Sequence, residues 1–237
     1  MNVFVAETLG TALLITLGNG VVANAILHKT KGFNGGLIAI TFGWAIGVFV
    51  GVLTTANVSG AHLNPAVTVG LAVIGKFDWA LVPGYMLAQL IGAMIGSFFV
   101  WLIYRHHFDE TQDPATQLAV FSTAPSIRNA QQNFITEFLA TFIFMLTVMF
   151  ITKSSNSLGS LDALPVALVV LGIGLSLGGP TGYAINPVRD LGPRIMHSLL
   201  PIKHKGSSDW AYAWVPILAP FGGAITAALL YQMLMYF

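Results

Sequence analysis

The stretch of residues 35–55 contains no charged side chain. A helix needs about 20 mostly apolar residues to cross the hydrocarbon core of a bilayer, and several stretches of this chain meet that requirement. None of them alternates polar and apolar residues as the strands of a membrane barrel do, and a helix satisfies its own backbone in lipid. The sequence therefore predicts an all-α polytopic membrane protein with six transmembrane helices, at residues 3–27, 35–55, 80–104, 134–152, 163–179 and 211–237.

The composition agrees with a protein whose solvent is the bilayer. Only 8% of the 237 residues are charged and 55% are hydrophobic, whereas a soluble domain carries roughly 25% charged residues. The net charge of +1 argues against a nucleic-acid partner. The chain has no cysteine, which excludes disulfides and sulfur-ligated metals. No histidine has a second ligand at metal spacing, so we expect neither a metal nor a cofactor.

Two shorter apolar segments begin at polar motifs of the same form. SGAHLNPAVTVG, which starts at Ser59, and GYAINPVRDLG, which starts at Gly182, both fit the pattern G-x-x-x-N-P-x-x-x-x-G. The apolar pieces that follow, residues 64–74 and 186–198, are too short to span. An eleven-residue helix rises about 16 Å, roughly half of a hydrocarbon core about 30 Å thick. We therefore predict two re-entrant half-helices that together cross the membrane once.

The two halves of the chain resemble each other. The segment AETLGTALLI contains Glu7 and resembles TEFLATFIFM, in which Glu137 takes the matching position. Each half then contains two spans, a half-helix and a third span, and an odd number of spans makes the second copy run in the opposite direction. The sequence thus predicts one membrane domain over residues 1–237, with inverted-repeat halves at 1–104 and 134–237 joined by a loop at 105–133.

The asparagine and proline of each motif suit the start of a half-helix. Proline is tolerated at the first helical position, because the N–H that it lacks would have no intrahelical partner there. Free N–H groups and the helix dipole make each start partly positive, so two such ends facing each other at the midplane repel cations, including the hydronium ion. The side-chain amides of Asn64 and Asn186 can instead donate to a neutral hydroxyl or a water. We expect the irregular residues 59–63 and 178–185 to line a pore, since non-helical backbone at this depth is buried in protein or faces a wet cavity.

These motifs resemble the two signature loops of the aquaporin and glycerol-facilitator family, also called the major intrinsic protein family. The resemblance covers nearly the whole chain and is closest to the glycerol-conducting branch, the aquaglyceroporins. It implies a lipid-embedded homotetramer with one pore per subunit, which passively conducts glycerol, other small neutral solutes and water and excludes protons and ions. The residues that it places at the pore midplane are Asn64, Pro65, Ala66, Asn186, Pro187 and Val188.

The resemblance also implies a selectivity filter made of Trp44, Gly174, Tyr183 and Arg189. Water-selective members of the family have histidine where this chain has Gly174, and we expect the glycine to widen the gap. The Trp44 and Tyr183 rings then form an apolar corner for a carbon backbone. Arg189 supplies several fixed donors for hydroxyls and adds a positive barrier against cations.

Two positions depart from the family pattern. The third residue of the second motif is Val188 instead of alanine, and we expect it to change the packing against the opposing loop while the pore stays intact. Tyr183 stands where glycerol channels typically have phenylalanine. Its extra hydroxyl either narrows the filter or offers another hydrogen bond, so the preferred solute stays open.

Four further polar residues are candidates for pore lining or for bracing the loops. Glu7 and Glu137 are ionisable groups inside spans, which by default suggests function, but their matched positions favour acceptance of loop N–H groups. His62 lies two residues before Asn64 and either lines the pore or braces its loop. Asp190 is typical of the glycerol-conducting branch, and we expect it to orient Arg189 or the first turn of the half-helix.

Several functions remain in competition with a glycerol channel. Within the same class are a water-preferring pore and pores tuned to urea, dihydroxyacetone or protonated lactic acid. A proton-coupled secondary transporter is the alternative from another class, because inverted repeats and broken helices also build transporters. An enzyme is disfavoured, since the chain offers no convincing nucleophilic or metal-dependent set of residues.

The distribution of basic residues conflicts with the orientation that the resemblance implies. The resemblance places both termini in the cytoplasm and the protein in the plasma membrane. On that topology the cytoplasmic side carries Lys76 and Lys153, and the positive-inside tendency taken alone places the N-terminus outside. We adopt the orientation implied by the resemblance. The basic residues on the opposite side are Lys29, Lys31, Arg105, Arg128, Lys203 and Lys205.

Overall fold

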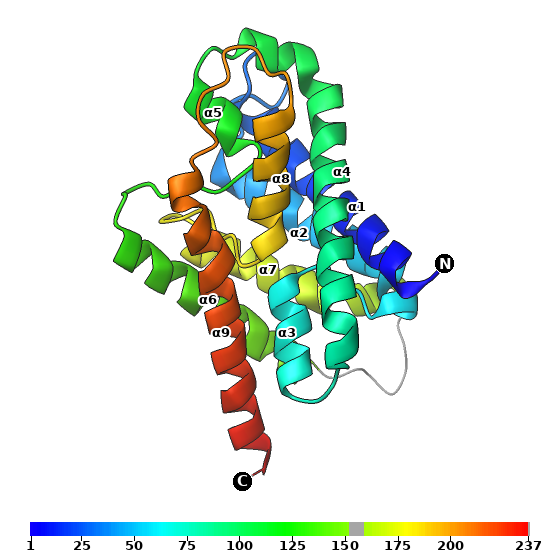
Figure 1. The fold of residues 1–237 in the computed structure, drawn as a ribbon. Helices are drawn as coiled ribbons and strands as arrows, with labels where there is room; N and C mark the ends of the chain where they lie inside the picture. Colours follow the sequence, from blue (N-terminus) through cyan, green and yellow to red (C-terminus); the bar gives the residue numbers. More distant parts are fainter. Residues whose placement is uncertain (152–158, 237) are drawn as a thin grey trace.

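The computed structural model describes residues 1–151 and 159–236. All regular structure within these ranges is helical, with no strand (Figure 1). The prediction of an all-α fold is therefore confirmed. Five of the described helices are long and apolar enough to cross a membrane. They are α1 (Val3–Ile26), α2 (Gly36–Ser59), α4 (Val82–Glu110), α6 (Ala130–Phe150) and α9 (Trp210–Tyr236).

The sixth apolar helix is shorter than the sequence predicts. It is α7 (Leu164–Leu177), which follows the short 3₁₀ helix η2 (Gly159–Ala163). The helix ends at a Gly178-Gly179-Pro180 sequence, and proline shortly after a helix cannot continue it. Three positions of the predicted organisation lie outside the described residues. They are Thr152 and Phe237, at the ends of two predicted spans, and Lys153 in the orientation count.

The two half-helices are α3 (Pro65–Val73) and α8 (Pro187–Leu199), and each begins directly after the asparagine of its motif. Asn64 caps α3 by accepting a hydrogen bond from the Ala66 N–H at 2.8 Å. Asn186 caps α8 by accepting one from the Val188 N–H at 3.2 Å. In Figure 1 the two half-helices follow each other between α4 and α9, and their ends are in contact.

The long helices of each half pack through small residues. In the first half α1 packs against α2 and α4, and in the second half α6 packs against α7 and α9. A Cβ atom added to Gly92 of α4 would lie 2.4 Å from the carbonyl oxygen of Thr8. A Cβ added to Gly223 of α9 would lie 2.3 Å from that of Phe138. Close backbone contact at glycine is the usual way in which membrane helices associate.

The segment between the halves is more ordered than the predicted loop at 105–133. Helix α4 continues to Glu110, a short helix α5 (Pro114–Ala119) follows, and α6 already begins at Ala130. The reason is a second hydrophobic cluster, separate from the main core, which buries Phe108 and Phe121 with residues from both ends of the chain. The other members of this cluster are Ala23, Leu27, Val100, Trp101, Val120, Leu200 and Ile202.

Candidate functional site

The backbone just before each half-helix has an unusual conformation. We call residues 60–63 the first pore loop and residues 182–185 the second pore loop. Ala61 and Leu63 have φ angles of 50° and 51°, and Tyr183 and Ile185 have φ angles of 38° and 44°. Non-glycine residues seldom adopt positive φ, and such strain concentrates at functional sites. The same alternation in both loops means that neighbouring structure holds each of them in this conformation.

Glu7 holds the first pore loop. Its carboxylate is fully buried and accepts hydrogen bonds from the N–H groups of His62 and Leu63, at 3.0 and 2.8 Å. It also accepts from the Ser59 hydroxyl at 2.6 Å and the Gln89 amide at 2.8 Å. Four donors on two oxygens compensate a buried carboxylate, which would otherwise be strongly unfavourable.

Glu137 occupies the corresponding place beside the second pore loop. Its carboxylate is also fully buried and accepts hydrogen bonds from the N–H groups of Ala184 and Ile185, at 3.0 and 3.1 Å. The N–H groups of this loop have no partner in a helix, because the loop backbone is not helical. A carboxylate that accepts from them lowers the free energy of the loop conformation. The geometry is that of a brace, as the matched sequence positions suggested.

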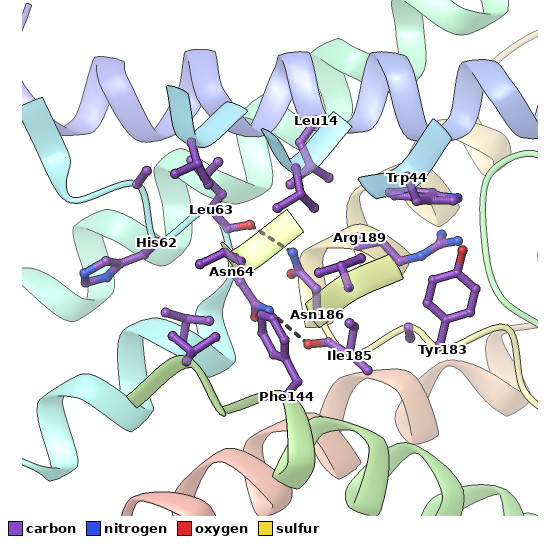
Figure 2. Close-up of a pocket in the computed structure, with 18 of the residues that line it drawn as sticks. Leu14, Trp44, His62, Leu63, Asn64, Phe144, Tyr183, Ile185, Asn186 and Arg189 are labelled. Carbon is purple, nitrogen blue, oxygen red and sulfur yellow. Dashed lines mark hydrogen bonds between the residues drawn. The ribbon is translucent and has the colours of Figure 1, made fainter. Parts of the chain in front are cut away.

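The capping asparagines join the two pore loops to each other. The Asn64 side-chain amide donates to the carbonyl of Ile185 at 2.9 Å, and the Asn186 amide donates to the carbonyl of Leu63 at 2.9 Å. Figure 2 shows these two hydrogen bonds at the centre of the site. Each amide has two N–H donors, so each keeps one donor for a solute after this contact.

One cavity of about 160 Å³ runs past these asparagines. Figure 2 shows Trp44, Tyr183 and Arg189 grouped at one end, His62 at the other end, and Asn64 and Asn186 between them. The intervening walls are aliphatic and aromatic side chains from five helices. They are Leu14 of α1, Val48 and Val52 of α2, Val67 and Leu71 of α3, Phe144 and Val148 of α6, and Val166 and Val170 of α7. The cavity therefore has polar groups from the loops against an apolar wall.

The end of the cavity at Arg189 is rich in hydrogen-bond donors. The guanidinium carbon of Arg189 lies 4.1 Å from the centre of the Trp44 ring, a cation–π contact. The Trp44 indole N–H and the Tyr183 hydroxyl are buried, and neither has a hydrogen-bond partner among the described residues. Buried polar groups are normally paired, but these two atoms are enclosed by protein and do not face the cavity.

Gly174 lies behind the cavity, next to Thr41 and Tyr183. It is absent from the described residues that line the cavity. A Cβ atom added there would lie 2.4 Å from Cγ2 of Thr41 and 3.0 Å from Cζ of Tyr183. The Thr41 methyl group and the Tyr183 ring therefore occupy the space beside the glycine.

Among the described residues, Asp190 forms hydrogen bonds with Arg194 of its own half-helix and with Thr123, and not with Arg189. Its carboxylate accepts from Arg194 Nε at 2.7 Å and from the N–H and hydroxyl of Thr123, both at 2.8 Å. No direct hydrogen bond to Arg189 occurs among the described contacts. Arg194 is itself fully buried and also donates to the carbonyls of Ser208 and Thr123, at 2.6 and 3.0 Å. The i, i+4 spacing of Asp190 and Arg194 in α8 was a sequence signal for this pair.

The residues after the two asparagines are buried in the protein and are not among the described residues that line the cavity. Pro65 and Pro187 are buried at the first positions of α3 and α8, and Ala66 is fully buried. Val188 is 4% exposed and belongs to the main hydrophobic core. Its two extra methyl groups relative to alanine therefore pack inside the protein.

His62 lies at the end of the cavity opposite Arg189. Its Nδ1 atom lies 3.1 Å from the Thr68 hydroxyl, and its ring meets the rings of Phe77 and Tyr85 with centroids 4.6 and 5.0 Å apart. The Tyr85 hydroxyl donates to the carbonyl of Ser59 at 2.9 Å. The sequence analysis did not identify Phe77, Tyr85 or the Gln89 donor to Glu7, because none of these residues belongs to a sequence motif.

This arrangement of paired half-helices and a shared cavity matches a known group of proteins. The family model described as Major intrinsic protein matches residues 1–231. The chain belongs to the major intrinsic protein family. Members of this family are membrane channels and transporters, so the chain is not assigned to an enzyme family.

Individual major intrinsic proteins resemble this chain over nearly its full length. A probable glycerol uptake facilitator protein of Thermotoga maritima is 51% identical and covers 99% of this chain and all of its own length. A D/L-lactic acid transporter of Lactiplantibacillus plantarum is 40% identical, with 94% of each chain covered. The X-ray structure of the aquaglyceroporin from Plasmodium falciparum aligns with a TM-score of 0.87 at 34% identity, covering 98% of this chain and 96% of that one.

Proposed function

We propose that this protein is a passive transmembrane channel for glycerol and other small neutral solutes, with water as a co-permeant. The observation that carries the proposal is the cavity that connects Arg189, Tyr183 and Trp44 with His62 past the asparagine pair. Polar groups on one side and an aliphatic wall on the other suit an amphipathic polyol. Such a solute places its CH edge on the wall and its hydroxyls on the loops.

The Arg189 end of the cavity acts as the selectivity filter in this proposal. Trp44 and Tyr183 contact the carbon edge of the solute, and the Arg189 guanidinium donates to its hydroxyls. Gly174 contributes indirectly, because it accommodates the Tyr183 ring.

Ions are excluded by positive potential at two places along the cavity. The first turns of α3 and α8 point their free N–H groups and positive dipole ends at the midplane. The Arg189 charge adds a second barrier at the filter, because a fixed cation in a narrow pore repels another. Water and polyols cross both places, since the remaining amide donors of Asn64 and Asn186 bind neutral oxygens.

Two relatives direct the choice of solute. Glycerol is the first candidate because the Thermotoga maritima relative, at 51% identity, is named a probable glycerol uptake facilitator. Lactic acid is the second candidate, because the Lactiplantibacillus plantarum relative at 40% identity is named a D/L-lactic acid transporter. The donor-rich filter suits the carbonyl oxygen of a neutral acid as well as a polyol hydroxyl.

We extend the proposal to topology and assembly. The two halves are inverted repeats, which the matched positions of Glu7 and Glu137 beside their pore loops support. The protein is a homotetramer in the plasma membrane with both termini in the cytoplasm. A reporter domain fused after Phe237 should be active inside the cell, and activity outside the cell would contradict this topology.

The test is stopped-flow light scattering on proteoliposomes that contain the purified protein. We expect glycerol permeability well above that of empty vesicles, with a smaller increase for water and no proton uptake. Urea, dihydroxyacetone and lactic acid at a pH below its pKa complete the panel. Flux that requires a proton gradient would support a coupled transporter instead, and a water-only increase would refute the glycerol assignment.

A further inference from the structure

The position of the Tyr183 ring is determined from behind by α7. A Cβ atom added to Gly178 would lie 2.4 Å from Cδ1 of Tyr183, and one added to Gly174 would lie 3.0 Å from its Cζ. The ring therefore lies along two glycines spaced by one helical turn, with its hydroxyl end toward Gly174. Tyr183 lines the cavity and is 4% exposed, so a shift of this ring changes the opening.

Thr41 of α2 also packs against Gly174, next to the hydroxyl end of the Tyr183 ring. A Cβ atom added to Gly174 would lie 2.4 Å from the Thr41 Cγ2 methyl and 3.0 Å from Tyr183 Cζ, so both side chains lie next to this glycine. The Thr41 hydroxyl donates to the carbonyl of Leu37 at 2.8 Å. A β-branched side chain with a bonded hydroxyl has a fixed χ1 angle, so the direction of the methyl group is fixed too. Thr41 is fully buried and is not one of the described residues that line the cavity.

We infer that Thr41 is a positioning residue that sets the aperture of the filter. Its methyl group stops the hydroxyl end of the Tyr183 ring from moving along α7 toward α2, away from the lumen. The ring consequently stays beside Arg189, and the width available to a solute depends on a residue that no solute touches. This inference rests on the proposed function, because it presumes that the Arg189 end is the filter.

The experiment varies the methyl and the hydroxyl of Thr41 separately. Thr41→Ser removes the methyl and keeps the hydroxyl, and the ring then has room to withdraw. We expect the permeability of a five-carbon polyol relative to glycerol to rise by about ten-fold, the lower end of what one methylene changes in a fitted site. Thr41→Val keeps the methyl and should resemble the parent. Thr41→Ile adds a methylene and should lower the same ratio.

Thr55 provides the matched control. It lies on the same helix, is fully buried, and donates to the carbonyl of Gly51 at 2.9 Å in the same i to i−4 pattern, but does not line the cavity within the described structure. Thr55→Ser should leave the permeability ratio unchanged. Equal ratios for Thr41→Ser and Thr41→Val, or an equal shift with Thr55→Ser, would overturn the inference.

The parent protein separates the two levels of the proposal. If the parent conducts no glycerol, the proposed function fails before Thr41 is considered. If the parent conducts glycerol and the serine and isoleucine variants do not shift the ratio in opposite directions, only the inference about Thr41 fails. A variant that merely destabilises the protein lowers all permeabilities together and leaves their ratio constant, which also counts against the inference.

Discussion

The two pore loops have the same backbone conformation but are stabilised by different contacts. The first loop is stabilised by Glu7, whose carboxylate accepts hydrogen bonds from two backbone N–H groups, the Ser59 hydroxyl and the Gln89 amide of α4. The second loop meets Glu137, and its half-helix is also tied to distant loops by the Asp190–Arg194 pair. The half that carries Arg189 and Tyr183 therefore has two sets of stabilising contacts: those of Glu137 with the loop and those of the Asp190–Arg194 pair.

This difference follows from what each half must position. The first motif has Val67 three residues after its asparagine, and the second has Arg189 at the same place. Val67 needs only apolar packing, whereas a guanidinium in a pore needs a fixed position to act on a solute. Arg194 connects α8 with Thr123 and Ser208, which belong to the segments before α6 and before α9. The half-helix that carries Arg189 is thereby linked to both of these segments.

The largest expected effect comes from breaking the anchor that only the second half has. Arg194→Met leaves the Asp190 carboxylate buried without its partner, which destabilises a protein by about 3–5 kcal/mol. Thermal unfolding in detergent measures this loss. The exposed Arg105 is the matched control, and Arg105→Met should leave the unfolding temperature nearly unchanged. An Arg194→Met protein as stable as the parent would show that the anchor is dispensable.

A second change makes the filter half resemble the first half. Arg189→Val removes a charge that, at about 4 Å from a passing cation and an effective dielectric constant near 20, contributes about 4 kcal/mol to the barrier. We expect a measurable proton or cation leak with glycerol permeability retained. A pH-sensitive dye inside the proteoliposomes detects it. Val67→Ala at the matched position should remain ion-tight, and an ion-tight Arg189→Val would remove the charge from the account of selectivity.

The third change compares the two carboxylates directly. Glu7→Gln and Glu137→Gln each replace an acceptor oxygen with an amide that faces N–H donors, and hydrogen bonds to charged groups are worth about 1.5–3 kcal/mol each. Glu7→Gln should destabilise more, because each Glu7 oxygen accepts from one loop N–H and from either Ser59 or Gln89, so two donors lose their acceptor whichever oxygen is replaced. Unfolding temperatures of the two variants, measured side by side, test this. A larger loss for Glu137→Gln would reverse the comparison.

The smallest change makes the second motif identical to the first at its third residue. Val188→Ala removes two buried methyl groups, which corresponds to about 1–2 kcal/mol of stability. Because Val188 packs in the core and not in the cavity wall, water and glycerol permeabilities per folded molecule should stay the same. Stopped-flow measurements on matched protein amounts check this, and a changed solute preference would place Val188 in the lumen.

The helices and half-helices were predictable because their signals are local. Hydropathy over one span and the asparagine–proline start of a half-helix depend only on neighbouring residues. The predictions for helix α7 and for the segment 105–133 were less accurate. The start of α7 depends on a 3₁₀ turn, and the structure of 105–133 depends on a hydrophobic cluster with residues from both ends of the chain. The α5 helix carries too few residues to show an apolar pattern of its own.

The partners of the site residues were harder to predict than the residues themselves. The sequence indicated Asp190, but its contact with Thr123 joins residues 67 positions apart. It indicated that Gly174 widens the filter, and it did not indicate that the Thr41 methyl group and the Tyr183 ring pack against this glycine. Gln89 and Thr41 had no motif at all. Each of these relationships joins two elements that the linear order does not place side by side.

The sequence by itself determined that this chain lies in a membrane, that it spans it with helices, and that two asparagine-capped half-helices interrupt the spans. These features follow from hydrophobicity and from which backbone groups a short segment can satisfy alone. Only the tertiary structure decided which carboxylate holds which loop and what fills the space beside Gly174. Those outcomes depend on distances of a few ångströms between helices, and helix packing sets these distances only after every span is in place.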